Sequence, residues 1–193
     1  IGKFPKASDN YTILSLDTVL DIADLPGTYL RTARSPEFFE LEYQQKAADF
    51  LKGIGVCGLV VIGGDGSYQG AQKLVELGVP CVGIPGTIDN DLEYSETSLG
   101  FDTAVNVCME AVRSIRATSR SHDRPAVVEV MGRNCGDIAM STAMSTASEV
   151  VVVPEVEGWE VDQVAARLSS LIARGNTRAT IVVAEGAWKV MKP

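Results

Sequence analysis

The feature that most constrains this chain is residues 57–70, CGLVVIGGDGSYQG. An apolar run of strand length stops at two glycines, and the apolar residues that follow, as far as Leu77, recur at helical spacing. This pattern predicts a buried strand, a glycine-rich turn and a helix. Glycines let the backbone approach a ligand closely, and free N–H groups at a helix start attract an anion. Phosphate is therefore the expected ligand.

Asp65 stands between these glycines, where its carboxylate would repel a bare phosphate unless a cation lay between them. We therefore interpret Asp65 as a ligand for Mg²⁺ or for a bridging water. The structural alternative is a tight strand-to-helix connection in which Asp65 caps the helix. The motif alone leaves both interpretations open.

Composition and charge narrow the class of protein. With 193 residues, 46% of them hydrophobic, the chain is long enough for a substantial core. A net charge of −8 argues against a general binder of nucleic acid or of membrane surfaces. Any anion site must therefore be local.

The cysteine pattern and the chain start bear on location. Four cysteines without CxxC spacing and a single histidine favour buried free thiols over a disulfide framework or a metal site. No stretch reaches transmembrane length and residues 1–6 lack the apolar core of a signal peptide, so we expect a cytoplasmic protein. Because the chain starts at Ile1 and not at Met, we expect that Ile1 is not its natural beginning.

Strand and helix patterns alternate along most of the chain. A short helix is predicted at 18–23 with Asp17 as its cap, and Ser35 and Pro36 open a helix that continues through Leu51. Apolar runs predict strands at 79–84, 126–131, 150–153 and 180–184, and helical spacing predicts helices at 102–118, 134–147 and 161–173. Runs without alternation indicate strands buried on both faces, so we predict an α/β fold with a mostly parallel sheet.

Polar groups follow each of these strands. They are the glycine-rich turn and the segments 85–91, 131–133, 154–157 and 185–186. Because the carboxyl ends of strands in an open parallel sheet line the ligand crevice, we expect these groups to converge there.

The segment 85–91, PGTIDND, is the chemical candidate. Thr87, Asp89 and Asp91 alternate, so an extended segment would present all of them on one side. One carboxylate would accept a hydroxyl proton and the other would help to hold Mg²⁺ or a bound water. The alternative is an Asx-rich turn whose side chains cap backbone amides.

Arginines supply the complementary charge. Arg113, Arg116 and Arg120 lie at helical spacing, while Arg124 and Arg133 bracket a predicted strand. Guanidinium groups bind phosphates through paired hydrogen bonds. We favour this role for Arg133, whereas a solvated helix end accounts for Arg113 and Arg120.

Together these motifs resemble those of the 6-phosphofructokinases. The segments 63–67 (GGDGS), 85–91 (PGTIDND) and 129–133 (EVMGR) stand in that family's order and separation, and 32–38 (TARSPEF) resembles its earlier nucleotide motif. The resemblance runs from about Asp17 to Glu185. It implies Mg²⁺-dependent transfer of the γ-phosphoryl of ATP to the 1-hydroxyl of fructose 6-phosphate, in glycolysis.

The resemblance also implies site residues. Asp89 would be the general base, with Thr87 and Arg133 steadying the phosphoryl group, Asp65 linked to Mg²⁺, and Asp91 supporting it. The nucleotide would be held by Arg34, Ser35, Gly64, Asp65, Gly66, Ser67 and Gly70. The sugar phosphate would be contacted by Thr87, Ile88, Asp89, Met131, Gly132, Arg133, Glu185 and, across a subunit interface, Arg124.

Two glycines bear on the phosphoryl donor. In the pyrophosphate-using branch of the family, an aspartate replaces the residue that is here Gly66, and a lysine the residue that is here Gly86. Glycine at both positions keeps the pocket open for ATP, which makes pyrophosphate the weaker alternative. An effector site for ADP or phosphoenolpyruvate is implied at Arg116, Ala147, Ser148, Glu149 and Arg174, although the basic run expected after Gly175 is missing.

Family members also have an earlier glycine-rich loop and a longer C-terminal part, so we expect this chain to be an internal fragment. The resemblance divides it into a partial ATP-binding lobe, 1–100, and a partial fructose 6-phosphate-binding lobe, 101–193, with a Rossmann-like three-layer arrangement. It implies a homotetramer with shared active sites. The alternative to a working kinase is a fragment that binds nucleotide or phosphate without turnover.

Overall fold

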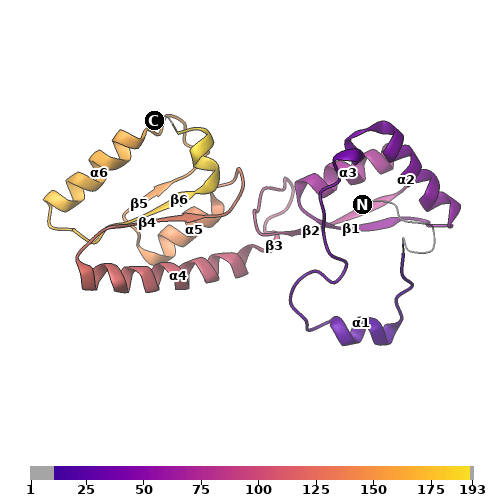
Figure 1. Cartoon of the computed structure of the whole chain (residues 1–193), viewed down its shortest axis with the longest axis horizontal. Helices are drawn as coiled ribbons and strands as arrows, with labels where there is room; N and C mark the ends of the chain where they lie inside the picture. Colours follow the sequence, from indigo (N-terminus) through magenta and orange to yellow (C-terminus); the bar gives the residue numbers. More distant parts are fainter. Residues whose placement is uncertain (1–10, 192–193) are drawn as a thin grey trace. The chain divides into compact units, whose positions relative to one another are not determined.

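The computed structural model describes residues 11–191, which form an α/β chain with two separate sheets (Figure 1). The first sheet has the order β1–β2–β3, with β1 (Leu59–Gly63), β2 (Cys81–Thr87) and β3 (Leu99–Gly100). The second has the order β4–β6–β5, with β4 (Ala126–Val130), β5 (Val150–Val152) and β6 (Thr180–Ala184). β2 runs parallel to β3, and β4 and β5 both run parallel to β6. The predicted α/β class with parallel sheets is confirmed.

The helices alternate with these strands. They are α1 (Leu16–Ile22), α2 (Leu41–Gly53), α3 (Asp65–Glu76), α4 (Phe101–His122), α5 (Asp137–Thr146) and α6 (Val161–Ala173), with 3₁₀ helices η1 (Pro36–Phe39) and η2 (Glu185–Lys189). The largest shift from the predicted strands is in β2, which starts two residues later than expected and continues through Pro85 and Gly86 to Thr87.

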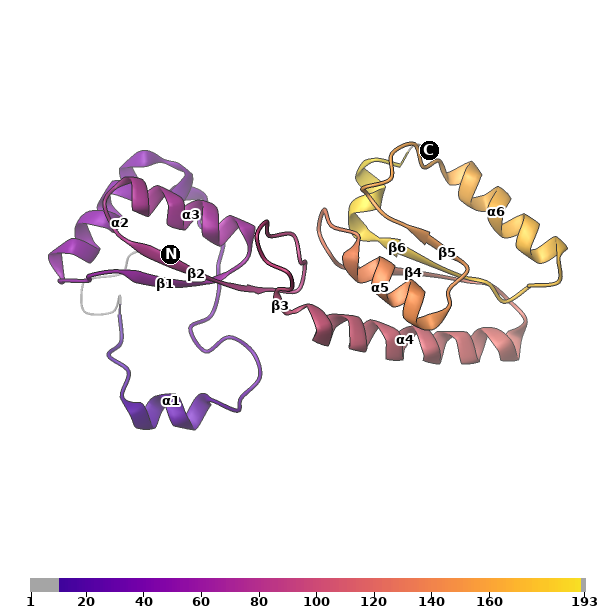
Figure 2. The same cartoon turned by 180° about the vertical axis from the view of Figure 1, so that it is seen from behind.

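The second sheet lies between two layers of helix. Val182 and Ala184 of β6 pack in a cluster with α5 residues and with Ala104 of α4, whereas Ile181 and Val183 pack with Val164, Leu168 and Leu171 of α6. Figures 1 and 2 show α4 and α5 on one side of this sheet and α6 on the other. Every residue of β6 is buried, as a central strand requires. The predicted three-layer arrangement holds here.

Burial in the first sheet is different. Ala47 and Ala48 of α2 pack with Leu74 of α3 and with Leu59 at the start of β1. Further along the strands, the side chains of Val60, Ile62 and Val82 are 62–65% exposed. The expectation that these strands are buried on both faces is therefore wrong for this chain.

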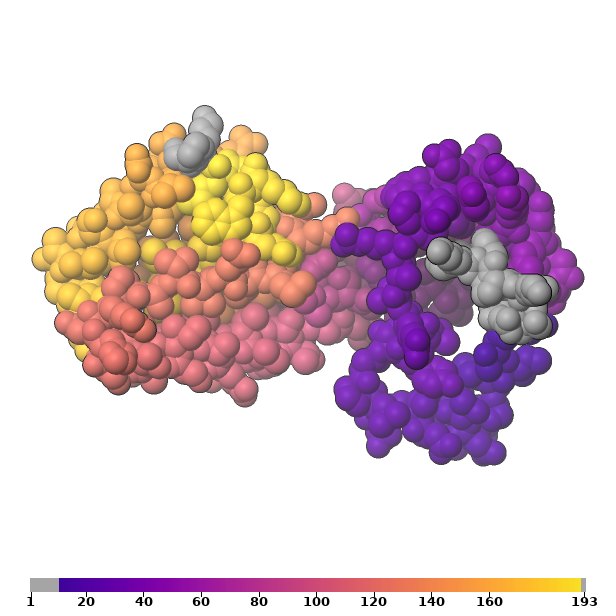
Figure 3. Space-filling model, in the orientation of Figure 1, coloured from indigo at the N-terminus to yellow at the C-terminus, as the bar shows by residue number. Residues whose placement is uncertain are grey.

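The N-terminal helices differ from the expected ones. α1 is capped by Ser15, whose Oγ accepts from the Thr18 N–H at 3.1 Å, and Asp17 lies inside the first turn. α1 has no buried residue, and Figure 3 shows the indigo to violet atoms of its segment at the surface. Two helices, η1 and α2, form where a single helix was expected from Pro36 onward, because the backbone of Glu40 between them is extended.

The chain forms two compact units. One contains the chain up to Leu59 together with Gly70–Cys81, and the other contains Val60–Gln69 and everything from Val82 onward. The predicted boundary near residue 100 separates the two sheets but not these units, so the assignment of lobes stays a prediction.

The four cysteines are free thiols, and Cys57 is exposed, although all four were expected to be buried.

Within residues 11–191, no helix is both long and apolar enough to span a bilayer.

Candidate active site

Asp89 lies in a sharp bend directly after β2. The strand ends at Thr87, and Asn90 has a φ of 56°, in the left-handed region. The Thr87 Oγ1 accepts from the Asp89 N–H at 3.2 Å. The segment 87–91 is therefore not extended, and the expectation that extended alternation aligns its side chains is wrong. The alternative, in which side chains of this segment cap backbone amides, describes the bend better.

The carboxyl group of Asp89 has a raised pKa. Desolvation is the largest cause, and repulsion from Asp91 and Glu185 adds to it. Arg133 and a hydrogen bond from Thr87 act in the opposite direction. Asp89 is thus surrounded by the ionisable side chains that the sequence assigned to one site. A raised pKa is typical of a carboxylate suited to accept a proton near neutral pH.

Arg133 belongs to a tight loop after β4 that Glu185 holds. The Glu185 Oε1 accepts from the Gly132 N–H at 3.2 Å and from the Arg133 N–H at 2.6 Å. Gly132 has a φ of 136°, and a Cβ there would lie 2.5 Å from the Cys135 carbonyl oxygen. The loop therefore requires glycine at position 132. It brings the Arg133 Nη1 to 4.0 Å from the Asp65 Oδ2.

The glycine-rich turn packs directly on Thr87. A Cβ on Gly64 would lie 3.2 Å from the Thr87 Cβ, so the turn and the end of β2 are adjacent. α3 begins at Asp65, which places Gly66 and Ser67 in its first turn. A Cβ on Gly66 would meet no atom within 4 Å, so this position faces open space.

Close packing explains why glycine stands at two other positions. A Cβ on Gly70 would lie 3.4 Å from a ring carbon of Phe38, and one on Gly86 would lie 2.8 Å from Ile62 Cγ2. Glycine at 86 is therefore accounted for by contact between strands, whereas glycine at 66 leaves space for a ligand.

Two carboxylates have the chemistry that Mg²⁺ prefers. The Asp65 Oδ2 accepts from Gln69 Nε2 at 2.8 Å, and the Asp91 Oδ1 is buried without a hydrogen-bond partner. No cluster of three or more acidic, histidine or cysteine side chains suited to a metal occurs among the described residues. Mg²⁺ needs none, because it keeps several waters and uses one or two carboxylates together with substrate phosphates. Asp65 and Asp91 are the side chains that would hold it.

Other predicted sugar-phosphate residues lie in different surroundings. Met131, at the carboxyl end of β4, is 60% exposed, and the Ile88 side chain packs against the core. Arg124 precedes β4, at the end of the strand opposite Arg133, and lines a surface hollow of about 580 Å³ with Ser114 and Ser119. Arg124 of this chain therefore does not join the group around Asp89.

Arg34 and Ser35 belong to the other compact unit. Both precede η1, and the Ser35 Oγ donates to the Glu37 Oε2 at 3.2 Å. Their part in holding a nucleotide stays a prediction.

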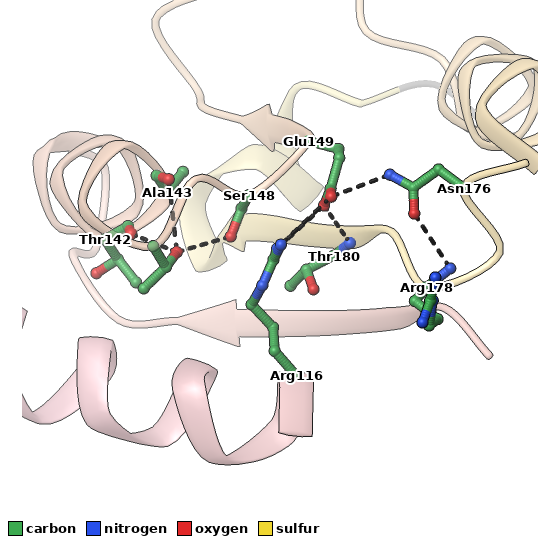
Figure 4. A network of polar contacts seen from close by, with 9 residues as sticks. Arg116, Thr142, Ala143, Ser148, Glu149, Asn176, Arg178 and Thr180 are labelled. Carbon is green, nitrogen blue, oxygen red and sulfur yellow. Dashed lines mark hydrogen bonds and ion pairs between the residues drawn. The ribbon is translucent and has the colours of Figure 1, made fainter. Parts of the chain in front are cut away.

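The predicted effector residues lie in α4 and in the segments before β5 and β6. The Glu149 carboxylate accepts from Arg116 at 3.1 and 3.4 Å, from Asn176 Nδ2 at 3.1 Å and from the Thr180 N–H at 2.7 Å (Figure 4). Burial acts to raise the pKa of Glu149, but these hydrogen bonds and the charge of Arg116 outweigh it, so the pKa is lowered. The pair joins α4 to β5 and β6, as a structural contact would.

The remaining predicted effector residues show no such network. Ala147 ends α5 with a φ of 50°, the Ser148 Oγ lies 2.8 Å from the Thr146 Oγ1, and Arg174 is exposed. Their effector role stays a prediction.

Sequence reasoning missed three side chains that shape the site. The Asn90 Nδ2 donates to the Asp137 Oδ2 at 2.8 Å, and the Glu155 Oε1 accepts from the Gly136 N–H at 2.6 Å. Asn90 and Glu155 both stand in segments that follow strands, so their positions carried a signal, but their partners become visible only in the folded chain.

Comparisons with known proteins indicate one family. A sequence profile described as "Phosphofructokinase" matches residues 6–192. A protein from Clostridium tetani named ATP-dependent 6-phosphofructokinase is 52% identical over 172 residues, covering 89% of this chain and 54% of its own length. One of the same name from Paenibacillus macquariensis is 46% identical over 180 residues, covering 93% of this chain and 56% of its own length. The chain thus spans about half the length of these curated relatives.

Solved structures give the same answer. Phosphofructokinase from Saccharomyces cerevisiae matches with a TM-score of 0.70 and 35% identity, over 83% of this chain and 25% of that one. The T-state enzyme from Pichia pastoris matches with a TM-score of 0.74 and 31% identity, over 83% of this chain and 20% of that one. By the family profile and by these relatives, the chain belongs to the phosphofructokinase family.

Proposed function

We propose that the protein containing this chain is an ATP-dependent 6-phosphofructokinase, which transfers the γ-phosphoryl of ATP to the 1-hydroxyl of fructose 6-phosphate. The observation that carries this proposal is the surroundings of Asp89: a desolvated carboxyl group under the influence of Asp91, Glu185 and Arg133, beside a glycine-rich turn.

In this proposal, Asp89 accepts the proton of the 1-hydroxyl while Thr87 and Arg133 stabilise charge on the transferring phosphoryl group. Asp65 and Asp91 would hold Mg²⁺, which neutralises phosphate charge when it is bound. Phosphoryl transfer depends mainly on in-line positioning and charge neutralisation, so no protein nucleophile is needed. The first turn of α3, with Gly66 and Ser67, would hold the nucleotide phosphates through its free N–H groups.

We further propose a cytoplasmic homotetramer whose active sites are shared between subunits. The position of Arg124 supports sharing, because it lies at the opposite end of β4 from Arg133. A basic side chain there is suited to contact the sugar phosphate bound by a neighbouring subunit.

A second candidate applies to the 193 residues alone: binding of Mg-nucleotide without turnover. It is favoured by the matched share of the relatives, only 54–56% of their length, and by the exposed strand residues Val60 and Ile62. Loss of charged contacts removes transition-state stabilisation directly.

A coupled assay of ADP release with fructose 6-phosphate, Mg²⁺ and ATP tests the proposal. The assay compares the chain with its Asp89→Asn variant and with the control Asp24→Asn, which alters an exposed loop aspartate. A second assay uses pyrophosphate as the phosphoryl donor and measures fructose 1,6-bisphosphate, because no ADP is released from pyrophosphate. We expect turnover with ATP that falls roughly 10²–10⁴-fold in Asp89→Asn only, the usual contribution of a general base.

Other outcomes separate the candidates. Mg-ATP binding by calorimetry without turnover would leave the binding fragment as the function of this chain. Turnover with pyrophosphate but not with ATP, or equal turnover in Asp89→Asn, would refute the proposed kinase assignment.

A further inference from the structure

We propose that Asn90 is a positioning residue that ties the bend carrying Asp89 to the loop carrying Arg133. This inference rests on the proposed function, in which those two side chains act on the same phosphoryl transfer. Both ends of the Asn90 carboxamide are engaged. Its Nδ2 donates to the Asp137 Oδ2 at 2.8 Å, and its Oδ1 accepts from the Ser98 N–H at 2.9 Å.

The backbone of Asn90 takes part in the same link. Its φ of 56° lies in the left-handed region, which asparagine tolerates better than most residues. Its carbonyl oxygen accepts from the Cys135 Sγ at 3.9 Å. Asn90 thus contacts the start of α5 through its side chain and the segment before α5 through its backbone.

The loop on the other side of this link is itself anchored. Glu185 holds the N–H groups of Gly132 and Arg133, and Glu155 holds that of Gly136. Carboxylates therefore fix both ends of the segment 132–136 to the chain that follows β5 and β6. Asp137 follows this held segment directly, so its hydrogen bond with Asn90 connects the segment to the bend. Asp89 therefore cannot shift far from Arg133 without breaking this bond.

The surroundings of position 90 favour a side-chain carboxamide. Its neighbours Asp89 and Asp91 are acidic, and its partner Asp137 is a carboxylate that needs a donor. Aspartate at this position would lose the Nδ2 donor and add a negative charge beside Asp89. Burial of the Asp91 Oδ1 without a partner makes an added charge still less favourable.

Four variants test the inference. Asn90→Gly keeps the left-handed backbone and removes both side-chain hydrogen bonds. Asn90→Asp adds a charge, and the double swap of Asn90→Asp with Asp137→Asn exchanges donor and acceptor across the same link. Tyr94→Gly is the matched control, because Tyr94 also has a positive φ, 64°, in the same loop but is fully exposed.

The first readout is the position of the Asp89 and Arg133 backbone amide signals in ¹H–¹⁵N NMR spectra of this chain. We expect Asn90→Asp and Asn90→Gly to shift both signals, the double swap to return them toward their parent positions, and Tyr94→Gly to leave the Arg133 signal in place. The second readout is turnover. Asn90→Gly should reduce kcat by roughly 10–100-fold with much less effect on the KM for ATP, since misplacement of a reacting group by about 1 Å costs that much.

An Arg133 amide signal that is unchanged in Asn90→Gly, or equally shifted in Asn90→Asp and the double swap, would overturn the inference. If Asn90→Gly fails to fold, the comparison of Asn90→Asp with the double swap decides by the same criterion. If the parent chain shows no turnover, the kinase activity of this chain fails, but the NMR measurements still decide the role of Asn90.

Discussion

At the scale of single residues, the surroundings of Asp89 lower the stability of the fold and make its carboxylate more basic. Its folded pKa lies above the ordinary value, chiefly because burial disfavours the charged form. The ionised carboxylate therefore destabilises the fold at every pH above the folded pKa, and this penalty disappears once the pH falls below the unfolded pKa. The same shift keeps Asp89 a stronger base than an exposed aspartate.

We accordingly predict that Asp89→Asn stabilises the chain at neutral pH. The gain should be below about 1 kcal/mol, since solvent screens this partly exposed group, and it should vanish below the ordinary pKa of aspartate. Urea unfolding at the two pH values measures it, with Asp24→Asn as the control. A loss of stability at neutral pH would show that the hydrogen bond with Thr87 outweighs desolvation.

At the scale of elements, one carboxylate joins α4 to two strands of the second sheet. The side chains of Arg116 and Glu149 are only 18% and 19% exposed, and the Glu149 carboxylate also accepts from the β6 backbone at Thr180. Removing one partner leaves the other charge poorly solvated, which costs more than an exposed ion pair contributes.

We predict that Glu149→Gln lowers the free energy of unfolding by about 1–3 kcal/mol at neutral pH. Because the pKa of Glu149 is lowered in the folded chain, this contribution is present above its ordinary value and is lost as the pH falls through the folded pKa. Fluorescence of Trp159 and Trp188, the two tryptophans of the chain, follows unfolding of this unit.

Two variants complete this test. Glu110→Gln, at an exposed position of α4, should change stability by no more than about 0.5 kcal/mol. Arg116→Met combined with Glu149→Gln should cost less than the sum of the single changes. Strict additivity would contradict a direct coupling between the two side chains.

At the scale of the whole molecule, the exposed apolar side chains predict association. Val60, Ile62 and Val82 of the first sheet are 62–65% exposed, and α1 exposes Leu16 and Leu20. Apolar surface of this kind is usually covered in a stable protein. The match with this chain covers 54–56% of the length of its curated relatives.

We therefore predict that the isolated chain self-associates, so that sedimentation gives an average mass above 20.6 kDa that rises with concentration. Val60→Lys combined with Val82→Lys should reduce association, because it places charge on the exposed strands. The control Val156→Lys alters a half-exposed valine in a loop and should not. A monodisperse monomer that unfolds in one cooperative step would refute this prediction.

Local patterns predicted much of this protein. The apolar runs of β4 and β6, the helical spacing of α6 and the glycine-rich turn before α3 follow from period and turn chemistry, which act between residues close in sequence. The combination of GGDGS, PGTIDND and EVMGR was specific enough to indicate the family that the comparisons confirm. Polar groups after the strands indicated one site on the expectation of a single parallel sheet. These strands form two sheets, so contacts in the tertiary structure decided which of the groups meet.

Contacts between distant residues were decided by the tertiary structure. The break between η1 and α2 at Glu40 accompanies donation from Gln44 Nε2 to the Phe38 carbonyl oxygen, and the bend at Asn90 depends on Ser98 and Asp137. Burial of β1 side chains depends on which other elements of the fold pack against each face of the strand. Sequence periodicity thus determined the elements and their chemistry, whereas partners far apart in the chain determined bends, burial and charge, because those depend on atoms that only folding brings together.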